Sequence, residues 1–312
     1  MLMLEQHLSQ FSCLLTATGI PWSRRHIGGK HDRRVVLGLM IHGDEVGSLP
    51  GALAVMSELS SGALSYGGIA DFFIGNVPAA RAGVRCIEAD LNRVFTDAAP
   101  DSAERRRARS LTELLDGCDL FLDLHQTALP AARPFFTLPW RPLEARWIRA
   151  LKTDAAWITR PSGVRFSPGL RCADEYVRDQ GRPGITLELG EQGFSPEATA
   201  ASAAVIRRTL ALMDAVDAQG DAVLTGPLPP CYRYSHAEPF TDRTLRLRPG
   251  LVNFQPVAAG EVLSAPGTPT LRAPTDGVLL FPKYPADDAM LPATIFRLAV
   301  PLPQPPAVLW GG

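Results

Sequence analysis

Compact apolar runs alternate with longer segments over the first two thirds of the 312-residue chain. Residues 34–40 and 69–77 are short runs with β-branched residues, bounded by glycine or polar positions, which is typical of buried strands. Residues 103–115 and the alanine-rich segment 196–216 have the length and end signals of helices. Strands that alternate with helices predict an α/β fold, in which helices cover both faces of a sheet.

The alternation ends near residue 225, where the linker-like segment GPLPP (residues 226–230) follows. Beyond it, short apolar runs are separated by proline and glycine and show no helical period; they span residues 251–257, 261–263, 277–281 and 294–300. This pattern is typical of a small all-β unit. We therefore expect an α/β domain over residues 1–225 and a C-terminal β domain over residues 226–312.

The composition excludes several classes of protein. Hydrophobic residues make up 46% of the chain and charged residues 20%, which is enough apolar material for a sizeable core and argues against a disordered chain. The formal net charge of −1 argues against a nucleic-acid partner. No apolar run approaches the roughly 20 residues that a bilayer span requires, so no membrane partner is expected. Five widely spaced cysteines favour a reducing, cytoplasmic location.

Two of the predicted strands lead into a histidine that lies close to acids. The segment GLMIHGDEVG (residues 38–47) presents His42 and Glu45, whose spacing can direct an imidazole and a carboxylate to one point. The segment DLFLDLHQT (residues 119–127) delivers His125 at the carboxyl end of a strand, where open α/β sheets place their sites. Two histidines and a glutamate are a known catalytic zinc set, so one zinc ion per chain is expected here.

Three further features have two interpretations each. Asp123 either partners His125 or faces the opposite side of its strand, and the second interpretation is favoured. The ionic segment Asp90–Arg93, with Arg85 upstream, either holds a carboxylate or is a capped turn with solvent-facing arginines. Glu188, inside an apolar strand, is either buried with a partner or faces a cleft as an acid–base catalyst with a raised pKa.

HGDE, GNxxAxxxxxR, DLNRxF, DLH and LELG follow one another along the chain in an order that resembles the succinylglutamate desuccinylase/aspartoacylase family of the zinc carboxypeptidase-like superfamily. The resemblance covers most of the chain, including the stretch that we expect to form the small β domain. It implies a carboxypeptidase-like mixed sheet flanked by helices, with a C-terminal all-β domain. It also implies that His42, Glu45 and His125 bind zinc, and that Glu188 is the catalytic carboxylate.

The resemblance implies roles for five other side chains. Arg85 would polarise the scissile carbonyl, while Asn92 and Arg93 would hold a carboxylate of the substrate. A further substrate arginine is expected before the catalytic strand, and spacing selects Arg178, with Arg182 close behind it. A tyrosine from the β domain is expected near the pocket, and Tyr284 is the candidate.

The implied activity is that of a zinc-dependent amidohydrolase, which cleaves the linear amide bond of a small N-acyl amino acid. Two alternatives remain: a metallocarboxypeptidase that acts on a peptide or a cell-wall fragment, and a zinc-dependent binding protein without turnover. No motif identifies the acyl group or the amino acid, and a homo-oligomer is left open.

Overall fold

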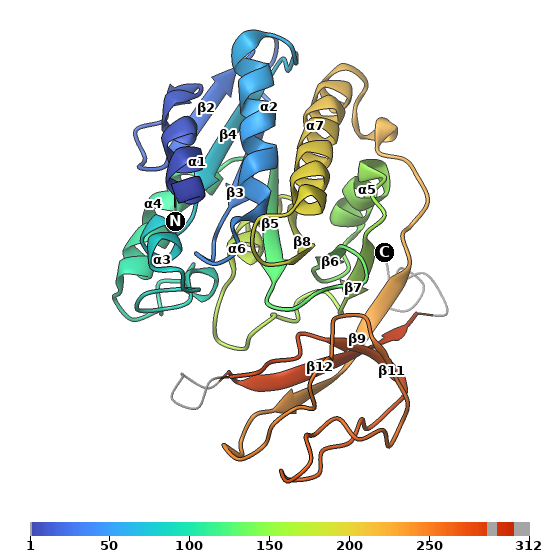
Figure 1. Ribbon diagram of the computed structural model, residues 1–312. Coiled ribbons are helices and arrows are strands. Elements are labelled where there is room, and N and C mark those ends of the chain that lie inside the picture. Colours follow the sequence, from blue (N-terminus) through green and yellow to red (C-terminus); the bar gives the residue numbers. More distant parts are fainter. Residues whose placement is uncertain (1, 286–291, 303–312) are drawn as a thin grey trace.

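The computed structural model describes residues 2–285 and 292–302. Its helices and 3-10 turns are α1 (Leu2–Cys13), η1 (Val46–Ser48), α2 (Leu49–Ser61), α3 (Val77–Ala82), η2 (Leu91–Arg93), α4 (Ala103–Leu115), α5 (Pro142–Leu151), α6 (Ala173–Asp179), α7 (Pro196–Gln219) and η3 (Asp221–Val223). Its strands are β1 (Thr16–Ala17), β2 (Ser23–Ile27), β3 (Arg34–Leu39), β4 (Ile69–Ile74), β5 (Leu120–Thr127), β6 (Phe135–Thr137), β7 (Ala156–Thr159), β8 (Gly184–Glu191), β9 (Cys231–Pro239), β10 (Pro256–Val257), β11 (Gly277–Leu280) and β12 (Thr294–Pro301). Figure 1 shows the helices around the first strands and the last strands below them.

The strands of the described residues form one mixed sheet in the order β1-β2-β4-β3-β5-β8-β6-β7-β9-β12-β11-β10. Its centre, β4-β3-β5-β8, is parallel. The strand β6 runs antiparallel to β8, and β7 runs parallel to both of its neighbours, β6 and β9. On its other side, β9 runs antiparallel to β12. The predicted α/β class with a mixed sheet and flanking helices is therefore confirmed.

The helices begin and end where side chains satisfy their free backbone groups. Ser102 caps α4 by accepting a hydrogen bond from the Arg105 amide, and Ser195 caps α7 in the same way. The last turn of α2 ends at Gly62, whose φ of +76° lies in the left-handed region that glycine adopts without strain. The predicted helices over residues 103–115 and 196–216 are confirmed as α4 and α7.

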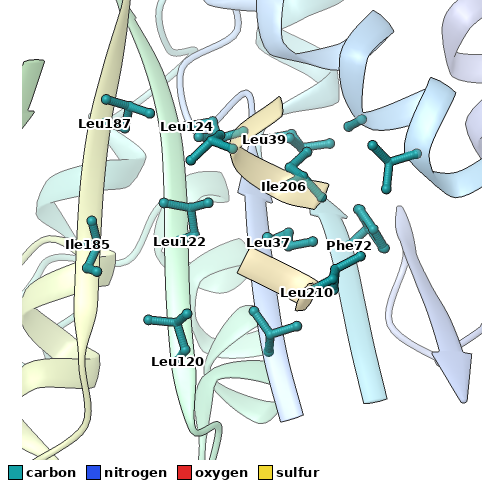
Figure 2. Close-up of a cluster of buried hydrophobic side chains, with 14 of the residues drawn as sticks. Leu37, Leu39, Phe72, Leu120, Leu122, Leu124, Ile185, Leu187, Ile206 and Leu210 are labelled. Carbon is teal, nitrogen blue, oxygen red and sulfur yellow. The ribbon is translucent and has the colours of Figure 1, made fainter. Parts of the chain in front are cut away.

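Alternation along the central strands divides the core into two layers. Leu37 of β3 and Leu122 of β5 belong to the same buried cluster as Ile206 and Leu210 of α7 (Figure 2). Residues of these strands that point to the opposite face, such as Phe121 on β5, belong to a second buried cluster together with residues of α4 and α6. Because successive side chains point to opposite faces of a strand, the face opposite the α7 layer also receives the polar residues of β5 and β8.

The C-terminal strands continue the central sheet, because β9 pairs with β7. The predicted runs at 277–281 and 294–300 are confirmed as β11 and β12, whereas only Pro256–Val257 of the run at 251–257 is a strand. The sequence patterns did not predict β9, in which partly buried and exposed residues alternate from Tyr232 to Pro239. The division into two domains stays a prediction, and its residues 286–291 and 303–312 lie outside the described part of the chain.

None of the helices in residues 2–285 and 292–302 combines the length and the apolar character that crossing a membrane requires.

Candidate metal centre and active site

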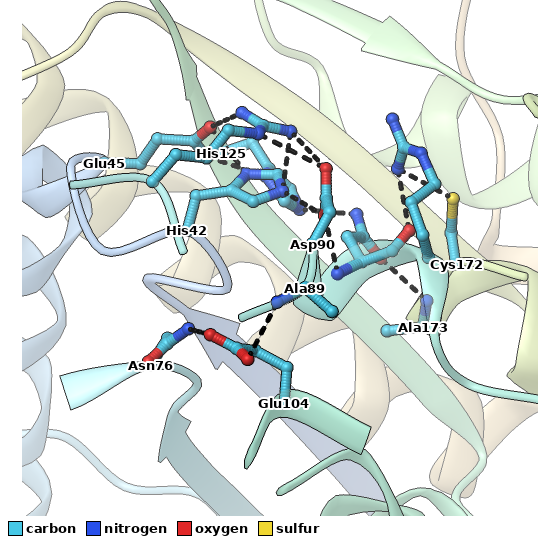
Figure 3. A network of polar contacts seen from close by, with 12 residues as sticks. His42, Glu45, Asn76, Ala89, Asp90, Glu104, His125, Cys172 and Ala173 are labelled. Carbon is cyan, nitrogen blue, oxygen red and sulfur yellow. Dashed lines mark hydrogen bonds and ion pairs between the residues drawn. The ribbon is translucent and has the colours of Figure 1, made fainter. Parts of the chain in front are cut away.

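Three neighbouring parallel strands bring the predicted site residues to one edge of the sheet. The chain reaches His42 shortly after β3 ends, while His125 and Glu188 lie near the carboxyl ends of β5 and β8. His125 and Glu188 are register partners, so their side chains lie side by side on the same face. Parallel pairing thus converts three distant sequence motifs into one cluster, whose polar contacts Figure 3 shows.

The turn after β3 is held in an unusual backbone conformation. Met40 has a φ of +51°, which is rare for a residue with a side chain, and its carbonyl accepts a hydrogen bond from the Asn76 amide. Gly43 packs so tightly against α3 that a side chain there would overlap the backbone of Ala79 and Ala80. These constraints turn the chain sharply, so that His42 and Glu45 face the end of β5.

His42, Glu45 and His125 form a buried cluster. Glu45 Oε1 lies 2.7 Å from His42 Nδ1, and Glu45 Oε2 lies 2.8 Å from His125 Nδ1. The three prospective ligand atoms lie within 4.8 Å of one another. Although burial opposes ionisation of Glu45, the two imidazoles hold its pKa below the ordinary value. A carboxylate between two ring nitrogens is a donor set that suits a divalent cation such as zinc.

Two carboxylates contact the outer nitrogens of the histidine rings. Asp123 Oδ2 lies 2.9 Å from His125 Nε2, and Asp90 Oδ1 lies 3.0 Å from His42 Nε2. When His125 Nε2 carries the hydrogen and donates it to Asp123, the lone pair of His125 Nδ1 points into the cluster. His42 Nε2 differs, because Arg85 Nη2, which can only donate, also lies 2.7 Å from it. Asp123 and Asp90 thus contact the ring nitrogens that face away from Glu45.

The favoured interpretation of Asp123 is wrong. We expected its side chain to face away from His125, but the two residues are two positions apart on β5, and such residues share a face. Burial raises the pKa of Asp123, and its Oδ1 has no hydrogen-bond partner in the described part of the chain. The contact with His125 is therefore the polar interaction available to this buried carboxylate.

Glu188 is the exception among the acids at this edge. Its side chain is buried, with 8% of its surface exposed, and its Oε2 has no hydrogen-bond partner among the described residues. Burial raises the pKa of Glu188 to about 7, while the nearby imidazoles act in the opposite direction. A carboxyl group with this pKa can both accept and release a proton near neutral pH. Glu191, its neighbour in sequence, is exposed.

The segment that precedes α4 covers the cluster from the solvent side. Arg85 donates to Glu45 Oε1 over 3.2 Å and to Asp90 Oδ2 over 3.1 Å. Asn92 Nδ2 lies 3.3 Å from His125 Nε2, and Asn92 Oδ1 accepts a hydrogen bond from the Ala173 amide. Asp90 also caps η2 by accepting from the Asn92 amide. The turn is capped, as one interpretation expected, but Arg85 is directed at the cluster rather than only at solvent.

Arg93 belongs to a group of cations around Phe166. The guanidinium carbons of Arg93, Arg160 and Arg297 lie 5.0, 5.6 and 4.8 Å from the centre of this ring. Arg160 pairs with Glu175, whereas Arg297 has no carboxylate partner in the described residues. Burial, together with Arg85, Arg297 and Arg93, lowers the pKa of Lys283 to about 8. The group therefore carries excess positive charge, which favours an anionic ligand.

Two predicted substrate residues are not brought to the cluster. Arg178 is buried and donates to Asp174 Oδ2 over 2.6 Å and to the Gly184 carbonyl over 2.7 Å. Gly184 begins β8 and lies four residues before Glu188, about 13 Å along the strand. The alternative, Arg182, pairs with Asp119 near the start of β5. Arg178 is thus placed for packing α6 against β8 rather than for binding substrate.

Tyr284 is also directed elsewhere. Its hydroxyl donates to the Arg248 carbonyl over 2.7 Å and accepts from the Leu251 amide, and the side chain is exposed. The adjacent Lys283 is the residue of this segment whose charge interacts with Arg85 and Arg93. A different tyrosine, Tyr234 on β9, lies close to Glu188: burial raises the pKa of Tyr234, and the charge of Glu188 raises it further. The Tyr234 hydroxyl lies within hydrogen-bond distance of the Thr137 hydroxyl, at 3.0 Å.

Sequence reasoning missed several residues of this region, namely Phe166, Tyr234, Lys283 and Arg297. One of them had a local signal: Arg297 interrupts the apolar strand TIFRLAV, where an arginine requires a reason. The others lie in segments without a distinctive pattern, and the tertiary structure brings them together.

Comparison with known proteins agrees with this arrangement. The sequence profile of the succinylglutamate desuccinylase/aspartoacylase catalytic domain matches residues 31–215. Succinylglutamate desuccinylase of Yersinia enterocolitica is 28% identical over 180 residues, which cover 52% of this chain and 53% of that protein. The chain thus spans about half the length of the curated relatives it matches in such alignments.

Solved structures share the fold over a longer span. Succinylglutamate desuccinylase from Chromobacterium violaceum has a TM-score of 0.67 at 20% identity, covering 96% of this chain and 98% of that one. Murine aminoacylase 3 has a TM-score of 0.60 at 20% identity, covering 86% of this chain and 95% of that one. At these identities the likeness shows the fold, whereas the profile match extends over more than half of the sequence. The chain belongs to the succinylglutamate desuccinylase/aspartoacylase family.

Proposed function

We propose that this chain is a zinc-dependent amidohydrolase that cleaves the amide bond of a small N-acyl amino acid. The observation that carries the proposal is the position of Glu188 beside the cluster of His42, Glu45 and His125. Its carboxyl group is buried and has no hydrogen-bond partner among the residues that the structure describes. A buried acid of this kind weakens a fold, so its presence beside three prospective metal ligands indicates a catalytic task. A binding protein without turnover has no need of it.

Zinc, when bound by His42, Glu45 and His125, would supply Lewis acidity that lowers the pKa of a water molecule towards about 7 and polarises a carbonyl. Glu188 accepts a proton from the attacking water and passes it to the leaving amine nitrogen, as its pKa of about 7 favours. Arg85 directs its guanidinium towards the cluster and donates to the oxyanion that develops on the acyl carbonyl. Asp123 and Asp90 keep the histidine rings in the required orientation.

The substrate is an anion in this proposal. Asn92 and Arg93 hold its carboxylate, which supplies orientation rather than chemistry. The positive charge of Arg297 and Lys283 beside Arg93 supports a second negative group on the substrate, such as the free carboxylate of a succinyl chain. N-succinyl amino acids are the first compounds to test, because the relatives are named as enzymes that desuccinylate succinylglutamate.

We also propose that residues 226–312 act as a separate β unit that narrows the entrance to the site. The support is a buried cluster drawn wholly from residues of this part, from Phe240 to Leu298.

A cytoplasmic location is proposed as well, because the five cysteines are all free in the described chain.

The test is amine release from N-acetyl and N-succinyl amino acids and from dipeptides, with and without added zinc. We expect zinc-dependent release from N-acyl amino acids that Glu188→Ala abolishes while the variant still binds one zinc ion. Release from dipeptides alone would replace the proposal with a carboxypeptidase. Stoichiometric zinc binding without release from any compound would replace it with a binding function.

A further inference from the structure

We propose that Glu104, which lies on α4 outside the cluster, is a positioning residue that holds Arg85 and Asp90 against His42. Its carboxylate acts as an anchor for the backbone of residues 87–89, which we call the anchored loop. The inference rests on the proposed function where it concerns catalysis, and on geometry alone where it concerns the loop.

Packing does not explain why the anchored loop keeps its shape. Ile87 is 50% exposed, and Val84, shortly before the loop, is 41% exposed. Next to the loop lies a cavity of about 290 Å³, which is lined in part by Ile87, Glu104 and Arg107. A segment with so few apolar contacts needs polar contacts to stay in one conformation.

Glu104 supplies those contacts with both of its oxygens. Its Oε1 accepts from the Ile87 amide over 2.7 Å, and its Oε2 accepts from the Glu88 and Ala89 amides over 3.2 and 3.1 Å. Oε1 also accepts from Asn76 Nδ2 over 3.1 Å, and Asn76 is the residue that caps α3. One buried carboxylate thus joins three consecutive amides of the loop to the end of β4, and Figure 3 shows its contacts with Ala89 and Asn76.

The anchored loop contacts α4 in the reverse direction as well. Glu88 Oε2 accepts from the Ala103 amide over 2.6 Å, at the first turn of the helix. Burial opposes ionisation of Glu104, yet the amides of Ile87 and Ala89 and the side chain of Asn76 lower its pKa. The carboxylate is therefore the form that these contacts select, and charge strengthens each hydrogen bond.

The residues on either side of the anchored loop are the ones that touch the cluster. Arg85 and Asp90 both contact His42, and Asp90 also caps the turn that carries Asn92. The Arg85 carbonyl accepts from the Gly43 amide over 2.9 Å, which ties the start of the segment to the turn after β3. Loss of the anchor would let Arg85 and Asp90 shift together, although Glu104 itself touches neither.

The first measurement is Glu104→Gln with Glu113→Gln as the control, because Glu113 lies on the same helix and is exposed. In the wild type, both side-chain oxygens of Glu104 accept hydrogen bonds from backbone amides. Glutamine replaces one of these oxygens with an NH₂ group, which can only donate and therefore cannot accept from a backbone amide. We expect hydrogen exchange at residues 87–89 to accelerate at least tenfold in Glu104→Gln and to stay unchanged in the control. Unchanged exchange in Glu104→Gln would overturn the anchor. This measurement needs no activity, so it separates failure of the anchor from failure of the proposed function.

The second measurement is a double-mutant cycle in the zinc-loaded enzyme. We expect Glu104→Gln to lower kcat by about 10- to 100-fold, as a misplaced catalytic group does, with zinc content unchanged. In an Arg85→Ala background the same substitution should lower kcat by a smaller factor, because the part of its effect that passes through Arg85 is already lost. Equal losses in both backgrounds would overturn the positioning role. Glu104→Asp keeps the charge and serves if Glu104→Gln does not fold. Partial exchange protection together with partial activity supports the role, whereas lost exchange protection with full activity contradicts it.

Discussion

Two buried carboxylates close to the same face of the sheet have opposite surroundings. Asp174 on α6 pairs with Arg178 over 2.6 Å, and although burial opposes its charge, Arg178 and Thr186 lower its pKa. Glu188 on β8 lies two residues after Thr186 on that face. It has no such partner within residues 2–285 and 292–302, and burial raises its pKa to about 7. Asp174 is thus an acid that holds two elements of the fold together, whereas Glu188 is an acid that can exchange a proton near neutral pH.

This contrast assigns roles that residue type alone does not. Arg178 is an arginine before the catalytic strand, as a substrate residue would be, but its donors serve Asp174 and the Gly184 carbonyl. Arg297 comes from the far end of the chain, lies beside Phe166 and has no carboxylate partner in the described residues. Unsatisfied charge, rather than sequence distance from a motif, therefore identifies the residues available to a substrate.

The largest effect is expected from Glu188→Gln. Loss of the proton acceptor should lower kcat by about 10²- to 10⁴-fold, the usual contribution of general acid–base catalysis, while zinc content stays at one ion per chain. The measurement is steady-state hydrolysis together with metal analysis. Glu191→Gln, at an exposed position nearby, serves as the control and should stay within twofold of the wild type. Near-normal turnover in Glu188→Gln would remove Glu188 from the mechanism.

Arg178→Met should act on stability instead. Removing one partner of a buried ion pair leaves Asp174 uncompensated, so the free energy of unfolding should fall by about 3–5 kcal/mol. Urea unfolding measures this, and Arg182→Met, at a half-exposed surface pair, should change it by less than about 1 kcal/mol. A raised KM without a loss of stability would return Arg178 to the substrate site.

The two acids also predict opposite responses of stability to pH in the metal-free protein. The raised pKa of Glu188 means that its contribution is fully present below about pH 4.5 and is lost as the pH rises through about 7, an effect of about 3 kcal/mol. The lowered pKa of Asp174 means that its contribution is present above the ordinary aspartate value and is lost as the pH falls.

Urea unfolding of wild type and Glu188→Gln at pH 5 and pH 8 tests the first statement. Glu188→Gln should gain stability relative to the wild type at pH 8 and lose most of that advantage at pH 5. An advantage that is the same at both pH values would show that Glu188 is not strained in the folded chain.

The smallest effect is expected from Tyr284→Phe, which extends the comparison to the tyrosines. Its hydroxyl is satisfied by the Arg248 carbonyl and the Leu251 amide, so its removal should cost about 0.5–1.5 kcal/mol of stability and change kcat/KM less than twofold. Tyr234→Phe, at the tyrosine close to Glu188, is the informative counterpart and should change kcat/KM more. A larger loss of activity in Tyr284→Phe than in Tyr234→Phe would contradict this assignment.

The fold and the metal cluster were largely predictable, because their signals are local. The run at 34–40 is a strand since its side chains suit burial on both faces, and the helix over 103–115 begins at a serine cap. His42, Glu45 and His125 were predictable because each lies within a few residues of a strand end, and parallel strands bring their carboxyl ends together. The side of the strand that Asp123 faces could have been derived from strand periodicity, but was assigned wrongly.

The sequence by itself determined the α/β order of the elements, the three prospective ligands and the candidate acid Glu188, since periodicity and motif spacing act over a few residues. Only the tertiary structure decided that Arg178 is paired and that Tyr284 turns away. It alone also brought Arg93 and Arg297, from distant segments, to the ring of Phe166. It also decided that Glu104 reaches three amides of a loop before its own helix. The reason is physical: whether a charge is free or satisfied depends on what folding brings within about 3 Å of it, and no local pattern records that distance.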